Sequence, residues 1–441
     1  MRDSAVQNLS WVDEFIANVR SYVFVRVEDA VLIRRPNRVH KLNETGARIL
    51  GALLDGALIA DVLARIGNAP GRVRETAAFL CAVRQALDGG AGAFPSGPAV
   101  DVAPAALNVT ALPVLAEIAL THRCNLRCAF CYAGCGCAGA PGGAARTMAT
   151  VDAERILGVI WHRARVPSVS FTGGEPALVN DLPRLVRHAK HLGMRVNLIT
   201  NGTVVTERLA RTLRDHGLDS AQVSIEGVTA AVHERITGVA GSFGLTVAGA
   251  RHLAAAGIVT HTNTTLCRWN AAEAALLPEF ARDVLAFPRF SMNLMMPVGA
   301  AAQDESLVIG YAEAGAHIEA VRTAAELAGV EFMWYSPVPL CLYNTIANGL
   351  GNKGCSACDG LLSIGPGGDV LPCSSWDEPV GNLLAEPFEK VWSSRAAARC
   401  RAKMFAHPRC AACEHFTACH GACPLYWRHR GYEELPWRPH C

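Results

Sequence analysis

Short apolar runs alternate with longer helical stretches through the middle of the chain. The helical stretches, such as TVDAERILGVIWHRAR at 150–165, repeat apolar residues at helical spacing. Strands that alternate with helices form parallel sheets, and the carboxyl ends of such strands carry the chemistry. We therefore predict an α/β fold with a partial (β/α) barrel over residues 114–335. The apolar runs cover residues 114–120, 168–174, 195–200, 220–227, 258–266 and 290–296.

A different pattern precedes this region. The segment YVFVRVEDAVLIRR at 22–35 alternates apolar and polar residues like two strands, with an acidic pair at the bend. Asn43 is a suitable N-cap for the helical stretch that follows, and Asp55-Gly56 ends that stretch. Two strands and three short helices predict a winged-helix-like domain over residues 1–95. The three helical stretches are 44–54, 58–66 and 71–90.

Two further segments complete the predicted organisation. Residues 96–113 continue a stretch rich in Gly, Ala and Pro (DGGAGAFPSGPAVDVAPAAL), which is typical of a linker. Residues 336–441 lose the strand-helix alternation and are rich in Cys, Gly and Pro. Such a segment has little core of its own, so we expect bound metal to stabilise it.

The composition of the 441 residues excludes several classes of protein. With 51% hydrophobic and 18% charged residues and no apolar run of about 18 residues, a membrane-spanning chain is not expected. The net charge of +2 comes from dispersed basic residues, so we expect no nucleic-acid partner. The start, MRDSAVQNLSWVDEF, lacks the apolar core of a secretory signal, which predicts a cytoplasmic protein. In that reducing compartment, 17 cysteines favour metal or redox chemistry over disulfides.

The most informative cysteines follow the first predicted barrel strand. Cys124, Cys128 and Cys131 form the pattern CxxxCxxC. Three thiolates on one loop can bind three irons of a four-iron cluster and leave the fourth iron open to another ligand. A zinc knuckle or a set of reactive thiols is the alternative. We predict that these cysteines form a catalytic iron–sulfur site.

A second set of cysteines lies near the carboxyl end, in the pattern CxxCxxxxxCxxxC. Zinc fingers are the alternative here, but their two-plus-two pairing does not use so many interleaved cysteines. This set contains Cys410, Cys413, Cys419 and Cys423, with Cys341, Cys355, Cys358 and Cys373 upstream and Cys441 as the last residue.

The CxxxCxxC loop, with Phe130 between its last two cysteines, resembles the radical S-adenosylmethionine superfamily. The resemblance implies that the open iron binds the amino and carboxyl groups of S-adenosylmethionine, whose reductive cleavage yields a 5'-deoxyadenosyl radical. The segment FTGGEP resembles the Gly-rich strand end of the same family, where the backbone and Glu175 receive the methionine amino group. Its other matching residues are Gly173, Gly174 and Pro176.

Polar residues at later strand ends match the family less specifically. Asn201 in LITNG, and Ser224 with Glu226 in VSIEG, correspond to strand ends that approach the ribose and adenine. Polar residues commonly close a strand, so each match alone is ordinary. Arg235 in HERITG is a candidate for binding the S-adenosylmethionine carboxylate, and a solvated helix arginine is the alternative.

The carboxyl-terminal cysteines resemble the SPASM extension, which carries two further four-iron clusters. The cofactors implied are therefore three 4Fe-4S clusters and S-adenosyl-L-methionine. The resemblance assigns Cys410, Cys413, Cys419 and Cys441 to the outer cluster, and Cys373 and Cys423 to the inner cluster with two of Cys341, Cys355 and Cys358.

One departure from the pattern concerns the base. Ser374 follows Cys373, where SPASM sulfatase maturases have an Asp that serves as a base, so the pyrroloquinoline quinone and mycofactocin enzymes are closer analogues. The identity of the general base stays open between Asp377, Glu117, His122 and Tyr132.

The resemblance leaves several thiols without a cluster. Cys81 lies on an apolar helix face and is expected in a core. Cys135 and Cys137 are either mobile thiols near the barrel mouth or a further metal site. Cys267 and Cys400 have no predicted role.

The amino-terminal pattern resembles the peptide-chaperone domain of the pyrroloquinoline quinone pathway, which binds leader peptides. An exposed strand edge at 22–27 can accept a peptide as an additional strand. A winged-helix DNA reader is the alternative, although the third helix offers only Arg72, Arg74 and Arg84 as cations.

These observations favour an enzyme that oxidatively modifies a ribosomally synthesised precursor peptide, with an external low-potential electron donor as a second partner. An enzyme of the same chemistry acting on a small molecule or tetrapyrrole is the first alternative. A non-catalytic iron–sulfur electron carrier or redox sensor is the second.

Overall fold

The computed structural model describes residues 9–67, 69–87, 110–134 and 146–436. The chain forms two compact units, residues 1–115 and residues 116–441. Cys135, Cys137 and Cys441 lie outside the described residues.

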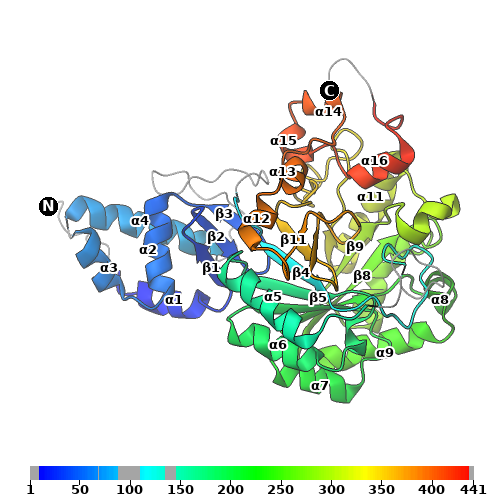
Figure 1. The fold of residues 1–441 in the computed structure, drawn as a ribbon, viewed down its shortest axis with the longest axis horizontal. Coiled ribbons are helices and arrows are strands. Elements are labelled where there is room, and N and C mark those ends of the chain that lie inside the picture. Colours follow the sequence, from blue (N-terminus) through cyan, green and yellow to red (C-terminus); the bar gives the residue numbers. More distant parts are fainter. Residues whose placement is uncertain (1–8, 68, 88–109, 135–145, 437–441) are drawn as a thin grey trace. The chain divides into compact units, whose positions relative to one another are not determined.

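The first unit is a small antiparallel sheet covered by helices (Figure 1). The predicted strand pair and its bend are confirmed by β1 and β2, and a third strand, β3, adds to β2. The prediction of two strands and three helices was therefore incomplete, because it missed β3 and the first helix. The elements are α1 (Val12–Val19), β1 (Val23–Arg26), β2 (Val31–Arg34), β3 (Arg38–Lys41), α2 (Glu44–Leu54), α3 (Ile59–Ile66) and α4 (Pro70–Leu87).

Local chemistry explains where α2 begins and how it packs. The Asn43 side chain accepts a hydrogen bond from the backbone N–H of Gly46 at 2.7 Å, as predicted for an N-cap. Gly46 is needed there because an added Cβ would lie 2.9 Å from the Phe79 ring of α4. Leu50 and Leu80 are buried between the helices and the sheet.

A buried ion pair fixes the end of the segment that leads out of this unit. The Arg26 side chain is fully buried and pairs with Asp29 at 2.7 Å. Its guanidinium also donates to the carbonyl oxygens of Leu112 at 3.0 Å and Pro113 at 2.7 Å. Because its charge and its N–H groups are matched, Arg26 tolerates burial.

The second unit is built on the predicted parallel sheet (Figure 1). Strands β4 to β10 are parallel and follow one another in chain order, which confirms the partial (β/α) barrel. These strands are β4 (Leu115–Ala119), β5 (Ser168–Thr172), β6 (Arg195–Thr200), β7 (Ser220–Ser224), β8 (Val259–Leu266), β9 (Arg289–Leu294) and β10 (Glu331–Trp334).

Helices follow these strands and cover the outer face of the sheet. They are α5 (Thr150–His162), α6 (Leu182–His191), α7 (Glu207–Asp215), α8 (Ala230–Thr237), α9 (Ser242–Ala255), α10 (Leu277–Glu279) and α11 (Tyr311–Ala328). Short turns also occur at η2 (Pro176–Leu178), η3 (Ala274–Leu276), η4 (Phe280–Val284), η5 (Gly299–Gln303) and η6 (Glu305–Leu307).

The two faces of the parallel strands differ in polarity. Val169, Phe171, Leu198 and Val223 are fully buried on the helix-covered face. Alternate residues on the other face are polar and hydrogen-bond between strands. The pairs are Asn197 to Ser170 at 3.2 Å, Ser220 to Asn197 at 2.8 Å, Ser291 to Asn263 at 2.9 Å and Asn263 to Asn293 at 2.7 Å.

The carboxyl-terminal region extends the same sheet, which the sequence pattern did not predict. Strand β11 neighbours β4, and β12 and β13 continue the sheet in antiparallel fashion. The remaining elements are short, as expected for a segment with little core. The strands are β11 (Leu361–Ile364), β12 (Asp369–Leu371) and β13 (Gly381–Asn382); the helices are α12 (Phe388–Trp392), α13 (Arg395–Arg401), α14 (Pro408–Ala411), α15 (Phe416–Cys419) and α16 (Pro424–Arg430).

In the part of the chain that the structure describes, no helix has the length and apolar character needed to cross a membrane.

Candidate active site and auxiliary cysteine sites

The loop after β4 carries Cys124, Cys128 and Cys131. Backbone hydrogen bonds fasten it to the end of α8, with Arg127 donating to Thr237 at 2.9 Å and Ala129 donating to Ile236 at 2.8 Å. Burial raises the pKa of the Cys124 and Cys128 thiols, and the charge of Cys131 acts in the same direction on both. Three thiols on one short loop can supply the thiolate ligands of an iron–sulfur cluster.

The Gly-rich segment after β5 packs directly against this loop. Gly173 has φ +134°, and a Cβ on it would lie 2.4 Å from the Thr121 carbonyl oxygen. A Cβ on Gly174 would lie 2.3 Å from the Arg123 carbonyl oxygen, immediately before Cys124. The glycines are therefore required by close backbone approach, and they bring the ends of β4 and β5 together.

Glu175 lies beneath this contact and is fully buried. Its carboxylate accepts hydrogen bonds from Thr200 Oγ1 at 2.6 Å and from the backbone N–H groups of Asn201 at 2.7 Å and Ala177 at 2.9 Å. Burial raises its pKa, and these three donors oppose that shift. Glu175 thereby links the ends of β5 and β6, while Pro176 begins the turn η2.

Asn201 connects the same strand end to the cysteine loop. Its Nδ2 donates to Asn125 Oδ1 at 3.0 Å and approaches Cys124 Sγ at 3.8 Å. Its Oδ1 accepts from Thr203. Asn201 is thus in contact with a cysteine of the predicted cluster.

The other predicted positions surround the loop less closely. Ser224 ends β7 and is half-buried. Phe130 packs against an apolar cluster that contains Ile236 and the buried thiol of Cys267. Arg235 is exposed, and its guanidinium lies 4.1 Å from the centre of the Trp269 ring, so a cation–π contact positions it.

Glu226, two residues beyond the end of β7, is a buried carboxyl near the loop. It accepts a hydrogen bond from the Thr265 backbone N–H at 2.9 Å. Burial raises its pKa to about 8, and its charge acts to raise the pKa of Cys128. The sequence identified it only as a polar strand end.

Glu117 differs from the other three candidates for the base. It lies on β4, accepts a hydrogen bond from Ser363 Oγ at 2.7 Å and is also hydrogen-bonded by Ser374. Burial raises its pKa. His122, Tyr132 and Asp377 are exposed. Ser374, the residue that replaces the expected Asp, therefore contacts the Glu117 carboxyl of β4.

The carboxyl-terminal cysteines separate into two groups. In the first, burial raises the pKa of Cys373 and raises that of Cys423 to about 12, and the charge of Cys355 acts in the same direction on both. The pKa of Cys358 is raised chiefly by a side-chain hydrogen bond with Cys400 and by burial, and the charge of Cys373 acts in the same direction, so Cys358 lies beside this group. The thiol of Cys400, which the sequence left without a role, is hydrogen-bonded to Cys358.

A buried ion pair supports this first group. Lys403 pairs with Asp359 at 2.9 Å, and both side chains are 3% exposed. The Lys403 ammonium also donates to the Cys355 carbonyl oxygen at 2.7 Å. The pair therefore fixes the loop that carries Cys355 and Cys358.

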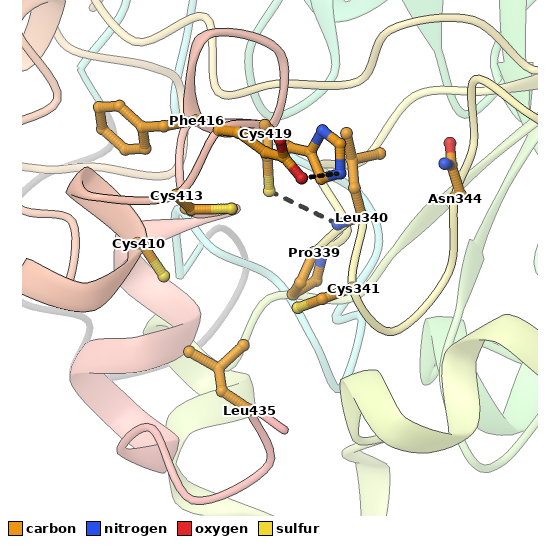
Figure 2. Close-up of a pocket in the computed structure, with 12 residues that line it drawn as sticks. Pro339, Leu340, Cys341, Asn344, Cys410, Cys413, Phe416, Cys419 and Leu435 are labelled. Atoms are coloured by element: carbon orange, nitrogen blue, oxygen red, sulfur yellow. Dashed lines mark hydrogen bonds and ion pairs between the residues drawn. The ribbon is translucent and has the colours of Figure 1, made fainter. Parts of the chain in front are cut away.

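The second group lines a cavity of about 230 Å³ (Figure 2). Cys410, Cys413 and Cys419 lie on or beside the short helices α14 and α15, and Cys341 enters from the turn after β10. Within the described ranges, no three His, Cys, Asp or Glu side chains gather closely enough to hold a single metal ion. Each thiolate that binds a four-iron cluster ligates a different iron, so a cluster needs no such gathering.

Comparisons with known proteins agree with this geometry. Residues 118–276 match the radical SAM superfamily, and residues 355–414 match the SPASM iron–sulfur cluster-binding domain. A PqqA peptide cyclase of Streptomyces rochei is 30% identical over 69% of this chain and 83% of its own length. An AdoMet-dependent heme synthase of Oleidesulfovibrio alaskensis is 28% identical over 68% of this chain and 80% of its own.

Solved structures share the fold at lower identity. Streptococcus suis SuiB, in a crystal structure bound to the precursor peptide SuiA, superposes with a TM-score of 0.70 and 18% identity over 92% of this chain and 95% of its own. The protein anSMEcpe with bound AdoMet gives 0.56 and 16% identity over 72% of this chain and 95% of its own.

The fold and the cysteine loop define an iron–sulfur enzyme that binds S-adenosylmethionine. The chain belongs to the radical SAM superfamily and carries a SPASM domain.

Proposed function

We propose that this enzyme oxidatively modifies a ribosomally synthesised precursor peptide. The observation that carries the proposal is the extent of the SuiB match. It covers 92% of this chain, more than residues 116–441 alone supply, so it includes part of the amino-terminal unit. SuiB is described with its precursor peptide bound, and the S. rochei relative at 30% identity is named for a peptide substrate.

The amino-terminal unit supplies a surface for the leader of such a peptide. Strand β1 is at one edge of the three-stranded sheet and β3 is at the other. A peptide can add to an edge strand as a further strand of the sheet. We assign leader binding to residues 1–95, with β1 as the acceptor, a linker at 96–113, the barrel at 114–335 and the auxiliary domain at 336–441.

The residues of the barrel fit the cofactors of the family. Cys124, Cys128 and Cys131 would hold the catalytic cluster, because the three thiols lie on one short loop after β4. S-adenosylmethionine held at that cluster would supply a 5'-deoxyadenosyl radical on reduction. Asn201 and Glu175 hold the cysteine loop and the Gly-rich turn together. An external low-potential donor in the reducing cytoplasm would provide the electron.

The auxiliary cysteines support two further clusters, which makes three in total. Cys355, Cys358, Cys373 and Cys423 are the four ligands we assign to the inner one. This choice uses two of the three competing cysteines and leaves Cys341 aside. The charges of Cys355 and Cys423 act on Cys373, and the charge of Cys373 acts on Cys358, so the four thiols are neighbours, which supports the assignment.

Glu117 is our candidate for the proton acceptor. A net oxidation of the peptide releases a proton in addition to the abstracted hydrogen atom and an electron. Burial raises the pKa of Glu117, which favours proton uptake, and hydroxyl groups of Ser363 and Ser374 orient its oxygens.

A tetrapyrrole substrate is the second candidate, because relatives named AdoMet-dependent heme synthase are nearly as similar. The polar face of the strands favours the peptide. Its serine and asparagine side chains form a polar surface, which suits the amide groups of a peptide better than the ring system of a tetrapyrrole.

The test uses the full chain, reconstituted anaerobically with iron and sulfide and supplied with S-adenosylmethionine and a low-potential reductant. Precursor peptides and coproporphyrin are added separately, and 5'-deoxyadenosine is measured by mass spectrometry. We expect a peptide with an intact leader to stimulate its formation and the porphyrin to have no effect. Stimulation by the porphyrin alone would overturn the proposal. The Cys124→Ala variant should form none in either case.

A further inference from the structure

A buried cation lies beside the inner group of auxiliary cysteines. We propose that Lys403 tunes the cluster held there, because its positive charge raises the reduction potential of that cluster. This inference rests on the proposed function, which assigns a cluster to Cys355, Cys358, Cys373 and Cys423. Lys403 acts through its charge and is not itself a ligand of iron.

The ammonium group of Lys403 is held against the loop that carries Cys355 and Cys358. It donates to the Cys355 carbonyl oxygen at 2.7 Å and to Asp359 Oδ2 at 2.9 Å. The Lys403 side chain is 3% exposed. Because water and salt screen a buried charge little, this ammonium acts on nearby groups more strongly than an exposed lysine would.

A second cation reaches the same loop. Arg401 Nη1 donates to the Cys358 carbonyl oxygen at 3.3 Å. Arg401 and Lys403 together outweigh the single carboxylate of Asp359, so the three groups leave net positive charge beside the loop. A reduced cluster carries one more negative charge than an oxidised one, and nearby positive charge therefore favours the reduced form.

The backbone fixes the position of both sides of this contact. Cys358 has φ +47° and Lys403 has φ +52°, in the left-handed region that residues with a Cβ rarely adopt. Such conformations persist only where the surrounding structure imposes them, and they concentrate at functional sites. The Lys403 backbone N–H also donates to the Cys400 carbonyl at 3.0 Å, which closes the turn that presents the lysine.

Stability alone is a weak reason for the Lys403–Asp359 pair. Removing two charges from water offsets much of their attraction, and apolar residues of similar volume often stabilise a protein equally well. A field at the cluster, in contrast, requires a charge. A raised potential suits a cluster that takes up the electron released when the peptide is oxidised.

The experiment measures the potential of the inner cluster without the catalytic one. The parent chain has Cys124, Cys128 and Cys131 changed to Ala. Iron per chain is measured after anaerobic reconstitution, and the clusters are then titrated with reductant and followed by electron paramagnetic resonance. The signal that Cys373→Ala removes from the parent identifies the inner cluster.

Three variants of the ion pair are made in this parent. They are Lys403→Met, Asp359→Asn and the double variant, which leaves no unpaired buried charge. The control is Lys390→Met on α12, because the Lys390 side chain is 72% exposed.

The two single variants should shift the potential in opposite directions. At the midpoint potential of the parent, we expect the ratio of reduced to oxidised inner cluster to fall about tenfold in Lys403→Met and to rise about tenfold in Asp359→Asn, as for one charge at about 10 Å in an effective dielectric constant of about 20. Lys390→Met should leave the ratio unchanged. If Lys403→Met does not fold, comparison of Asp359→Asn with the double variant isolates the charge of Lys403, and the double variant should have the lower ratio.

Unchanged potentials, or shifts of both single variants in the same direction, would overturn the inference. Loss of the inner cluster from all three variants would show that the pair has a structural role only, which also overturns it. A parent that binds no iron would count against the auxiliary clusters of the proposed function, and the inference would fall with them. Because no peptide is present, none of these outcomes depends on the identity of the substrate.

Discussion

Gly174→Ala tests whether the Gly-rich turn positions the cysteine loop. The added Cβ would lie 2.3 Å from the Arg123 carbonyl oxygen and 2.7 Å from its carbon. Since van der Waals contact between carbon atoms needs roughly 3.5 Å, the Arg123 carbonyl must move by about 1 Å. Two backbone hydrogen bonds cross this contact, Gly174 to Thr121 at 2.6 Å and Glu175 to Arg123 at 2.8 Å.

The size of the effect follows from these contacts. Loss of the partner of a buried backbone group costs about 1–3 kcal/mol, so the two bonds together correspond to about 2–6 kcal/mol of local stability. Because Cys124 follows Arg123 directly, the displacement reaches the cluster loop, and a misplacement of about 1 Å lowers catalytic rates on the order of 100-fold. We expect that loss in 5'-deoxyadenosine formation, together with reduced iron content.

The control is Gly158→Ala in helix α5, where an added Cβ meets no atom within 4 Å. It should keep the wild-type rate and iron content. If Gly174→Ala also kept both, the contact between turn and loop would not position the cluster, and the reasoning would be refuted.

Three other perturbations test separate parts of the structure. Arg26→Met removes a buried, matched charge, so the free energy of unfolding measured in urea should fall by about 3–5 kcal/mol, whereas the exposed Arg48→Met should change it little. Glu117→Gln should continue to form 5'-deoxyadenosine but lose modified peptide in mass spectra; equal product yield would exclude Glu117 as proton acceptor. Burial, aided by the charges of Arg289 and Arg195, lowers the pKa of His261 from 6.5 to about 4, so its contribution to stability is present above pH 6.5 and is lost as pH falls towards 4. We therefore expect the free energy of unfolding of the iron-free chain, measured in urea, to fall as the pH is lowered from 6.5 to 4, and to fall less in the His261→Asn variant. An equal fall in both proteins would contradict the lowered pKa of His261.

The barrel was predictable because each strand is long enough to show a repeating pattern of apolar residues. Runs such as RVNLIT and SAQVS are apolar at every second position where the helices cover the sheet, and each precedes a helical stretch. The cysteine loop was predictable for a different reason. Its three cysteines lie within eight residues of one another, directly after a strand.

Other features depend on contacts that short sequence windows do not contain. Strand β3 has four mostly polar residues and exists because it pairs with β2. Strand β11 joins the barrel beside β4, although β4 comes more than two hundred residues before it in the chain. The hydrogen bond between Cys358 and Cys400 and the approach of Cys341 to Cys419 also join distant segments. Cysteine spacing alone therefore left the ligand sets open.

The most direct test of the central claim is the mass of the peptide after reaction. A precursor peptide is incubated anaerobically with the reconstituted enzyme, S-adenosylmethionine and reductant, and compared with the same peptide treated with the Cys128→Ala variant. We expect a product that has lost hydrogen atoms within the core peptide, formed together with 5'-deoxyadenosine and only when the leader is attached. The proposed function would be contradicted if the peptide stayed unmodified while a porphyrin, tested separately, led to rapid formation of 5'-deoxyadenosine.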